Sequence, residues 1–108
     1  MAFEIEWLES AERELDAEIA YVLENFGFTA AHKAYLRLHK HVSQLADFPL
    51  IGTIYQGVTY KGCEIRKLPI RQITLFYSPQ TDKVTILAVW NNYKDAGYIG
   101  FRLSEEDS

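Results

Sequence analysis

The chain has 108 residues, 48% of them hydrophobic and 14% aromatic, so we expect one well-formed core and no second domain. Its net charge of −4 excludes a general attraction to nucleic acid, because phosphate binding depends on the density of cations. The longest stretch without a charge, residues 48–60, contains a proline and two glycines and is shorter than the ~20 apolar residues of a membrane-spanning helix. No membrane segment is expected.

The N-terminus and the single cysteine indicate a cytoplasmic protein. The first residues lack the basic head and the apolar run of a secretion signal. Cys63 has no second cysteine with which to form a disulfide, as is usual in a reducing compartment. Because nothing around it in the sequence would activate a thiolate, we interpret Cys63 as an idle thiol rather than a nucleophile.

Charge is distributed unevenly along the chain. Residues 1–29 contain eight acids and one base, residues 30–94 contain nine bases and three acids, and the part from residue 95 is acidic again. The net charges of these parts are −7, +6 and −3. The middle of the chain therefore either presents a local positive surface or carries ordinary solvated charges.

The first half of the chain predicts a strand and two helices. Residues 3–7 alternate apolar and acidic side chains, which is typical of a half-buried strand. Ser10 and Thr29 are the predicted N-caps of two helices, which end before Gly27 and Pro49. Both helices have apolar residues at spacings of three or four: Ala11, Leu15, Ile19, Val22 and Phe26 in the first, and Ala31, Tyr35, Leu38, Val42 and Leu45 in the second. A short connection makes them an antiparallel hairpin.

The second half predicts strands over residues 60–68, 70–77 and 84–90, joined by short turns into an antiparallel meander. The last strand is almost entirely apolar, so we expect it inside the sheet. The predicted fold is α+β, of order β-α-α-β-β-β, with the N-terminal strand and the helical hairpin packed on an antiparallel sheet. We expect a single domain over residues 1–103 and a disordered acidic tail over residues 104–108.

Sites for metals and cofactors are not predicted. His32, His39 and His41 fall in the second helix, but no two of them are four residues apart, the spacing with which a helix holds a metal ion. The chain also lacks a glycine-rich phosphate loop and the nucleophile elbow of a hydrolase. Ordinary hydrolase and nucleotide-binding chemistry is therefore poorly supported.

The basic residues of the sheet are the candidate surface for a partner or target. The candidates are Lys61, Arg66, Lys67, Arg71, Tyr93 and Lys94. Strand alternation places Arg66 on the same face as Glu64, and Lys67 on the opposite face. An arginine in a covered sheet is costly without a partner. Arg66 therefore either pairs with an acid such as Glu64 or with backbone carbonyls and holds the sheet, or it binds a ligand.

Several short motifs follow one another in order: Ile5-Glu6-Trp7 with Ala11 and Leu15, Phe48-Pro49-Leu50-Ile51-Gly52, Ile65-Arg66-Lys67-Leu68-Pro69-Ile70, Leu75-Phe76-Tyr77, and Val84 to Trp90 leading into Asn92-Tyr93-Lys94-Asp95. Over residues 3–96 this set resembles the RelE/ParE superfamily of toxins from bacterial type II toxin–antitoxin modules, which includes plasmid stabilisation proteins. Each motif is weakly specific alone, and the ordered set is more specific.

The resemblance implies the β-α-α-β-β-β fold and a small antitoxin that lays an extended or helical segment over the toxin. It also implies one of two activities. RelE-like members cut messenger RNA in the ribosomal A site, whereas ParE-like members inhibit DNA gyrase by binding and have no catalytic centre. We assign no catalytic residue unless the protein is a nuclease, in which case the candidates are Arg66, Arg71, Tyr93 and Lys94.

Two departures from the superfamily pattern favour the non-catalytic activity. The segment after Trp90 has Tyr93-Lys94 in place of the usual arginine pair, and the chain is acidic where ribosome-dependent nucleases tend to be basic. RNA cleavage needs a base near the 2′-hydroxyl and cations at the phosphate, and no histidine lies near the predicted sheet. The sequence thus favours a ParE-like toxin that binds a protein target. The alternatives are an mRNA endoribonuclease and a non-toxic interaction module.

Overall fold

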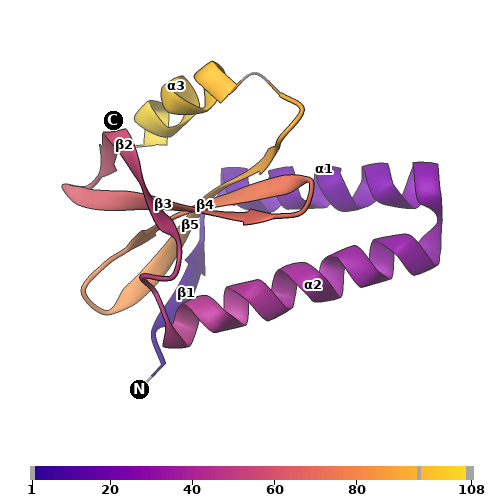
Figure 1. Ribbon diagram of the computed structural model, residues 1–108, viewed down its shortest axis with the longest axis horizontal. Coiled ribbons are helices and arrows are strands. Elements are labelled where there is room, and N and C mark those ends of the chain that lie inside the picture. Colours follow the sequence, from indigo (N-terminus) through magenta and orange to yellow (C-terminus); the bar gives the residue numbers. More distant parts are fainter. Residues whose placement is uncertain (1, 95, 107–108) are drawn as a thin grey trace.

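The protein consists of a five-stranded sheet with helices on both faces (Figure 1). A computed structural model describes residues 2–94 and 96–106. Its elements are β1 (Glu4–Trp7), α1 (Glu9–Phe26), α2 (Phe28–Asp47), β2 (Thr53–Tyr60), β3 (Cys63–Ile70), β4 (Ile73–Pro79), β5 (Lys83–Asn91) and α3 (Ala96–Glu106). None of the helices within these ranges is long and apolar enough to cross a membrane.

The strand order is β1-β5-β4-β3-β2, and the predicted α+β class is confirmed. Strands β3 to β5 form the predicted antiparallel meander, and β5 lies inside the sheet as its apolar sequence predicts. Strand β2 adds a further antiparallel strand beside β3. The N-terminal strand β1 pairs with β5 in parallel, from Glu4 opposite Lys83 to Trp7 opposite Ile86. The sheet is therefore mixed: β1 is parallel to β5, and all the other neighbouring strands are antiparallel.

The two helices of the hairpin begin without the predicted side-chain caps. Leu8 donates its backbone N–H to the carbonyl of Ile86 (3.1 Å), so β1 leads directly into α1 and Ser10 lies inside the helix. Gly27, at φ 90°, is the one residue between α1 and α2, so Thr29 lies inside the second helix. A positive φ is inexpensive only for glycine, which explains why the chain can reverse in so short a connection.

An apolar core lies on each face of the sheet. Under the hairpin, buried residues of the two helices (Ala11, Leu38, Val42 and Leu45) pack on buried sheet residues (Ile70, Leu75, Tyr77, Val84, Ile86 and Val89). On the other face, Tyr60, Ile65, Phe76, Leu87, Ala88 and Trp90 of the strands pack against Ile99 and Leu103 of α3. Strand β5 supplies both cores, which is why its residues are apolar on both faces.

Two elements were not predicted from the sequence. Strand β2 is an edge strand, and its pairing with β3 is irregular between Tyr55 and Thr59, which hides the alternation of a regular strand. Helix α3 extends over residues that the sequence assigns no structure. Residues 104–106, predicted as part of a disordered tail, form its last turn, and residues 107–108 lie outside the described residues.

Candidate functional site

Arg66 is held by groups of its own chain. Its Nε atom forms an ion pair with Glu64 Oε2, and its Nη1 atom donates to the carbonyl oxygens of Gly52 (2.7 Å) and Leu50 (3.2 Å). The side chain is only 15% exposed. Of the two interpretations that the sequence left open, the geometry matches the one in which Arg66 fastens the segment between α2 and β2 to the sheet.

Tyr77 holds the same segment from the next strand. Its hydroxyl oxygen accepts the backbone N–H of Gly52 at 2.8 Å, and burial raises the pKa of this phenol above its usual value. A Cβ at Gly52 would lie 2.6 Å from the carbonyl oxygen of Lys67 and 2.7 Å from the Tyr77 hydroxyl. Only glycine fits at position 52, and the residues around it have a structural role.

The other predicted basic residues do not form one cluster. Lys67 is paired with Phe76, a residue of the α3 core, so it lies on the face opposite Arg66 and is exposed. Lys61 lies in the turn between β2 and β3, with its Nζ atom 5.4 Å from the centre of its neighbour's ring. Arg71 lies in the turn between β3 and β4, so the length of β3 separates it from Lys61.

The segment that carries Tyr93 and Lys94 meets the turn that carries Arg71 at one end of the sheet. Asn92 donates its side-chain amide to the carbonyl of Arg71 (3.0 Å), which ties the segment after β5 to the β3–β4 turn. Tyr93 is 84% exposed, and the Lys94 Nζ atom lies 5.1 Å from the centre of the Trp90 ring. Three of the six predicted residues therefore lie toward this end of the sheet, but Lys94 lines a different hollow from Arg71. Arg66 lies roughly 16 Å from Arg71 along the strand at ~3.3 Å per residue.

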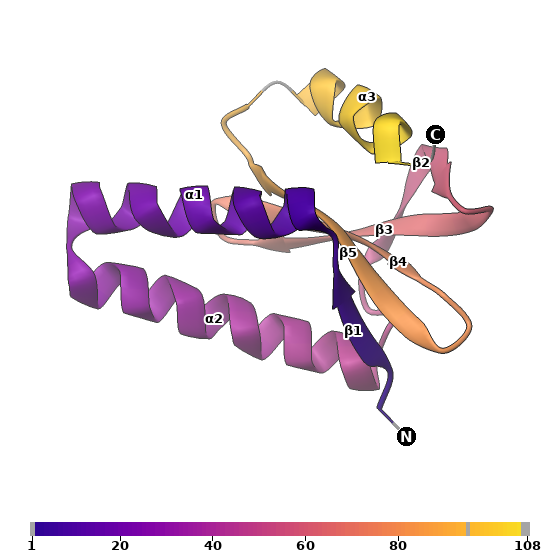
Figure 2. The same cartoon turned by 180° about the vertical axis from the view of Figure 1, so that it is seen from behind.

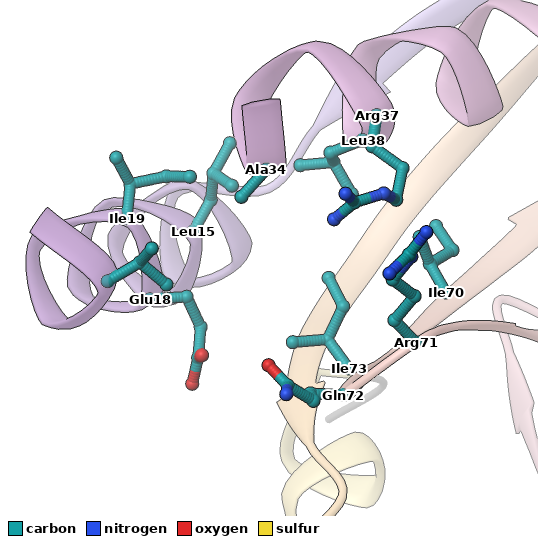
Figure 3. A pocket seen from close by; sticks show the side chains of 11 residues that line it. Leu15, Glu18, Ile19, Ala34, Arg37, Leu38, Ile70, Arg71, Gln72 and Ile73 are labelled. Carbon is teal, nitrogen blue, oxygen red and sulfur yellow. The ribbon is translucent and has the colours of Figure 1, made fainter. Parts of the chain in front are cut away.

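A groove lies beside this end of the sheet, between the hairpin and the β3–β4 turn. We call it the hairpin groove and define it by residues 15–26 of α1, residues 30–38 of α2 and residues 70–73. Its inner part is a cavity of about 60 Å³, and it opens toward the tip of the hairpin into a hollow of about 290 Å³. The inner part is lined mainly by apolar side chains (Figure 3).

Two arginines lie at the mouth of the hairpin groove. Arg37 comes from α2 and Arg71 from the β3–β4 turn, and their guanidinium groups extend toward one another (Figure 3). Within residues 2–94 and 96–106, neither forms an ion pair with a carboxylate. The acid in the groove, Glu18, accepts hydrogen bonds from the Asn91 side chain at 3.3 and 3.5 Å. This pair of cations can bind an anionic group from outside.

The sequence identified Arg71 as a candidate but not Arg37. The sequence contains a pattern that could have identified Arg37, because Lys33 and Arg37 are four residues apart and so share one face of α2. The sequence does not show where that face of α2 lies relative to the sheet, because this depends on how the hairpin crosses the sheet.

Within the described ranges, the geometry supports neither metal binding nor thiol chemistry. No cluster of three His, Cys, Asp or Glu side chains there could hold a metal ion. His32 stacks on Phe28, His39 packs on Tyr35, and the Nδ1 atom of His41 lies 2.8 Å from the carbonyl oxygen of Arg37. The Cys63 thiol is half-buried and lies 3.7 Å from the Gln80 side-chain oxygen.

Comparisons with known proteins agree with the observed fold. A sequence profile of the family described as "ParE toxin of type II toxin-antitoxin system, parDE" matches residues 5–95. A solved structure titled "Chromosomal ParDE TA system from P. aeruginosa" is similar with a TM-score of 0.68 and 18% identity, over 83% of this chain and 96% of that chain. At this identity the likeness shows the fold alone. A comparison with curated proteins finds no match.

Proposed function

This chain belongs to the ParE toxin family of type II toxin–antitoxin systems, and from that premise we propose that it is a toxin that acts by binding a protein target and is neutralised by a cognate antitoxin. DNA gyrase is the target we propose, and the cytoplasm the compartment. The observation that carries the proposal is the pair formed by Arg37 and Arg71, two cations at an apolar groove with no carboxylate partner in the described ranges. Such a surface suits a protein segment with apolar and acidic side chains.

The positions of the candidate nuclease residues support binding rather than catalysis. Arg66 has its guanidinium occupied by Glu64 and two backbone carbonyls, so it has little capacity left for a phosphate. Arg71 lines the hairpin groove, whereas Lys94 lies over Trp90 and lines a different hollow. Catalysis would require an acid and a base around one reacting phosphate, and these residues do not converge on one point.

The proposal is tested by expressing the full chain from an inducible promoter in a bacterial host and mapping transcripts by primer extension. We expect growth arrest with intact transcripts and an SOS response, together with inhibition of DNA supercoiling by purified gyrase in vitro. Codon-linked transcript cuts that disappear in the Arg71→Ala variant would instead establish the endoribonuclease. Normal growth after induction would leave only the hypothesis of a non-toxic interaction module. Co-expression of the protein encoded by the adjacent reading frame should restore growth.

A further inference from the structure

The connection between α2 and β2 exposes a group of large apolar side chains. It leaves α2 at the end far from the tip of the hairpin and leads into β2, an edge strand of the sheet (Figures 1 and 2). Phe48, Leu50, Ile51 and Ile54 are each between 46% and 65% exposed. We call these four residues the edge patch. Apolar side chains gathered in this way gain free energy when another apolar surface covers them.

The backbone brings the four residues of the edge patch to one place. Ile54 is paired with Arg66 of β3, so the two side chains share one face of the sheet. The Arg66 guanidinium donates to the carbonyl of Leu50, which places the connection on that same face. The N–H of Ile51 donates to the carbonyl of Phe48 (3.2 Å), so the connection is folded into a turn. The edge patch therefore lies on the hairpin side of the sheet, beside the outer edge of β2.

The fold fixes the backbone under the edge patch. Arg66 and Tyr77, both largely buried, bind the connection at residues 50 and 52, and only glycine fits at position 52. Apolar side chains on a mobile loop could fold back onto the core, but here the fixed backbone keeps them exposed. Side chains held in place before binding lose less entropy when a partner arrives. The edge patch thus has the properties of a docking surface.

The absence of charge favours a second copy of this chain as the occupant. Residues 48–60 contain no charged side chain. Arg66, which lies beneath the connection, is 15% exposed and forms an ion pair with Glu64. An acidic or basic partner would therefore find no counter-charge on the edge patch. A second copy would meet no like charge, which is what a surface related to itself by a two-fold axis requires.

The outer edge of β2 supplies a second self-complementary element. Among the described strands β2 pairs only with β3, so its other side has unpaired backbone N–H and C=O groups. The pairing with β3 is regular over residues 53–55 and irregular between Tyr55 and Thr59. Residues 53–55 are therefore the part of β2 that can pair with another strand. When two copies pair there in antiparallel fashion about a two-fold axis, Ile54 lies close to its own counterpart and the two edge patches meet.

We propose that the edge patch is a self-association surface, through which two copies of this chain join their β2 edges and merge two five-stranded sheets into one. The inference does not depend on the toxin function. Four exposed side chains and a short strand are less than the ~800 Å² per partner of a stable interface. The dimer is therefore in equilibrium with the monomer, with a dissociation constant on the order of 10–100 µM.

The test is sedimentation equilibrium of the full-length protein over concentrations from roughly ten-fold below to ten-fold above that constant. The average mass of the wild-type protein should rise from that of the monomer toward twice that value. Ile54→Lys and Ile54→Glu should each weaken association at least ten-fold, because each places two like charges at the two-fold axis. An equal mixture of the two variants should recover the dimer, because opposite charges then face one another.

Leu36→Lys is the matched control for these variants. Leu36 lies on α2 outside the edge patch and is 52% exposed, close to the 46% of Ile54. Adding a lysine there makes the same change in charge and in apolar surface, and it should alter the association constant less than two-fold. Circular dichroism and thermal unfolding verify that each variant folds.

Several results would overturn the inference. A wild-type protein that remains monomeric at the highest concentration has no such dimer. A dimer that the Ile54 variants leave intact uses another surface, and a mixture that associates no better than either variant alone shows that Ile54 does not face its counterpart. If the free protein is monomeric and Ile54→Lys weakens its binding to the product of the adjacent reading frame, the edge patch belongs to that partner instead.

Discussion

Arg102 at helix α3 and the two arginines of the hairpin groove differ in whether the protein supplies their counter-charge. On the α3 face, Arg102 is 12% exposed and bound by Glu14 and Glu106, and it also donates to a backbone carbonyl. At the mouth of the hairpin groove, Arg37 and Arg71 have no carboxylate partner in the described ranges. All three residues are arginines, but only Arg102 has carboxylate partners within the described part of the protein. An arginine satisfied internally stabilises the fold, whereas an arginine left open is available to a partner.

The largest expected effect comes from breaking the satisfied arginine. Arg102→Ala leaves the partly buried carboxylates of Glu14 and Glu106 without their cation, and removing one member of such a pair costs about 3 kcal/mol. The free energy of unfolding, measured with urea, should fall by about that amount. Arg102→Lys should recover part of the loss. A change below about 0.5 kcal/mol, the range of ordinary surface substitutions, would show that the Arg102 contacts do not fasten α3.

A smaller loss in the free energy of unfolding is expected when the segment between α2 and β2, which joins the hairpin to the sheet, loses a hydrogen bond. Tyr77→Phe removes the hydroxyl that accepts the buried N–H of Gly52, and an unsatisfied buried donor costs about 1–3 kcal/mol. The raised pKa of Tyr77 also predicts that the wild-type protein loses stability as the pH rises above 10, because the unfolded phenol ionises first. The Phe variant should show a flatter alkaline limb. An equally steep limb in both proteins would assign that loss to other groups.

A partly exposed ion pair, that of Lys83 with Glu6, should contribute less to stability than the contacts of Arg102. Lys83 donates to Glu6 at 3.1 Å between β1 and β5, and this hydrogen bond lowers the pKa of Glu6 below 4.5 and raises that of Lys83 above 10.5. The stabilisation from Glu6 is therefore present above pH 4.5 and is lost as the pH falls through its lowered pKa. Glu6→Gln should reduce the acid-induced loss seen in urea unfolding at pH 3 and pH 6. Because this pair is more exposed than that of Arg102, the effect should be smaller than that of Arg102→Ala.

The smallest effect on stability is expected at the open arginines. Arg37→Ala and Arg71→Ala remove no internal ion pair, so the free energy of unfolding of the free protein should stay within about 0.5 kcal/mol of the wild-type value. A modest gain is expected in the double variant, because two neighbouring cations are removed. Urea unfolding of the isolated toxin measures it. A loss similar to that of Arg102→Ala would mean that these arginines have internal partners and a structural role.

The sequence predicted what depends on local pattern. The hairpin, the three later strands of the meander and the interior position of β5 follow from apolar spacing, glycine and proline. It did not predict α3, whose contacts are with residues distant in the sequence, among them that of Arg102 with Glu14. Nor could it separate Arg66 from Arg71, because the partners of Arg66 include carbonyls of a loop whose path is set by tertiary packing.

Hydrogen exchange of the free toxin and of its complex with the antitoxin tests most directly whether Arg37 and Arg71 bind a partner. When the product of the adjacent reading frame binds, exchange should slow at the β3–β4 turn, residues 70–73, and along residues 30–38 of α2, while α3 keeps the exchange of the free protein. Slower exchange confined to α3 or to the edge strand β2, with the hairpin groove unchanged, would contradict the account.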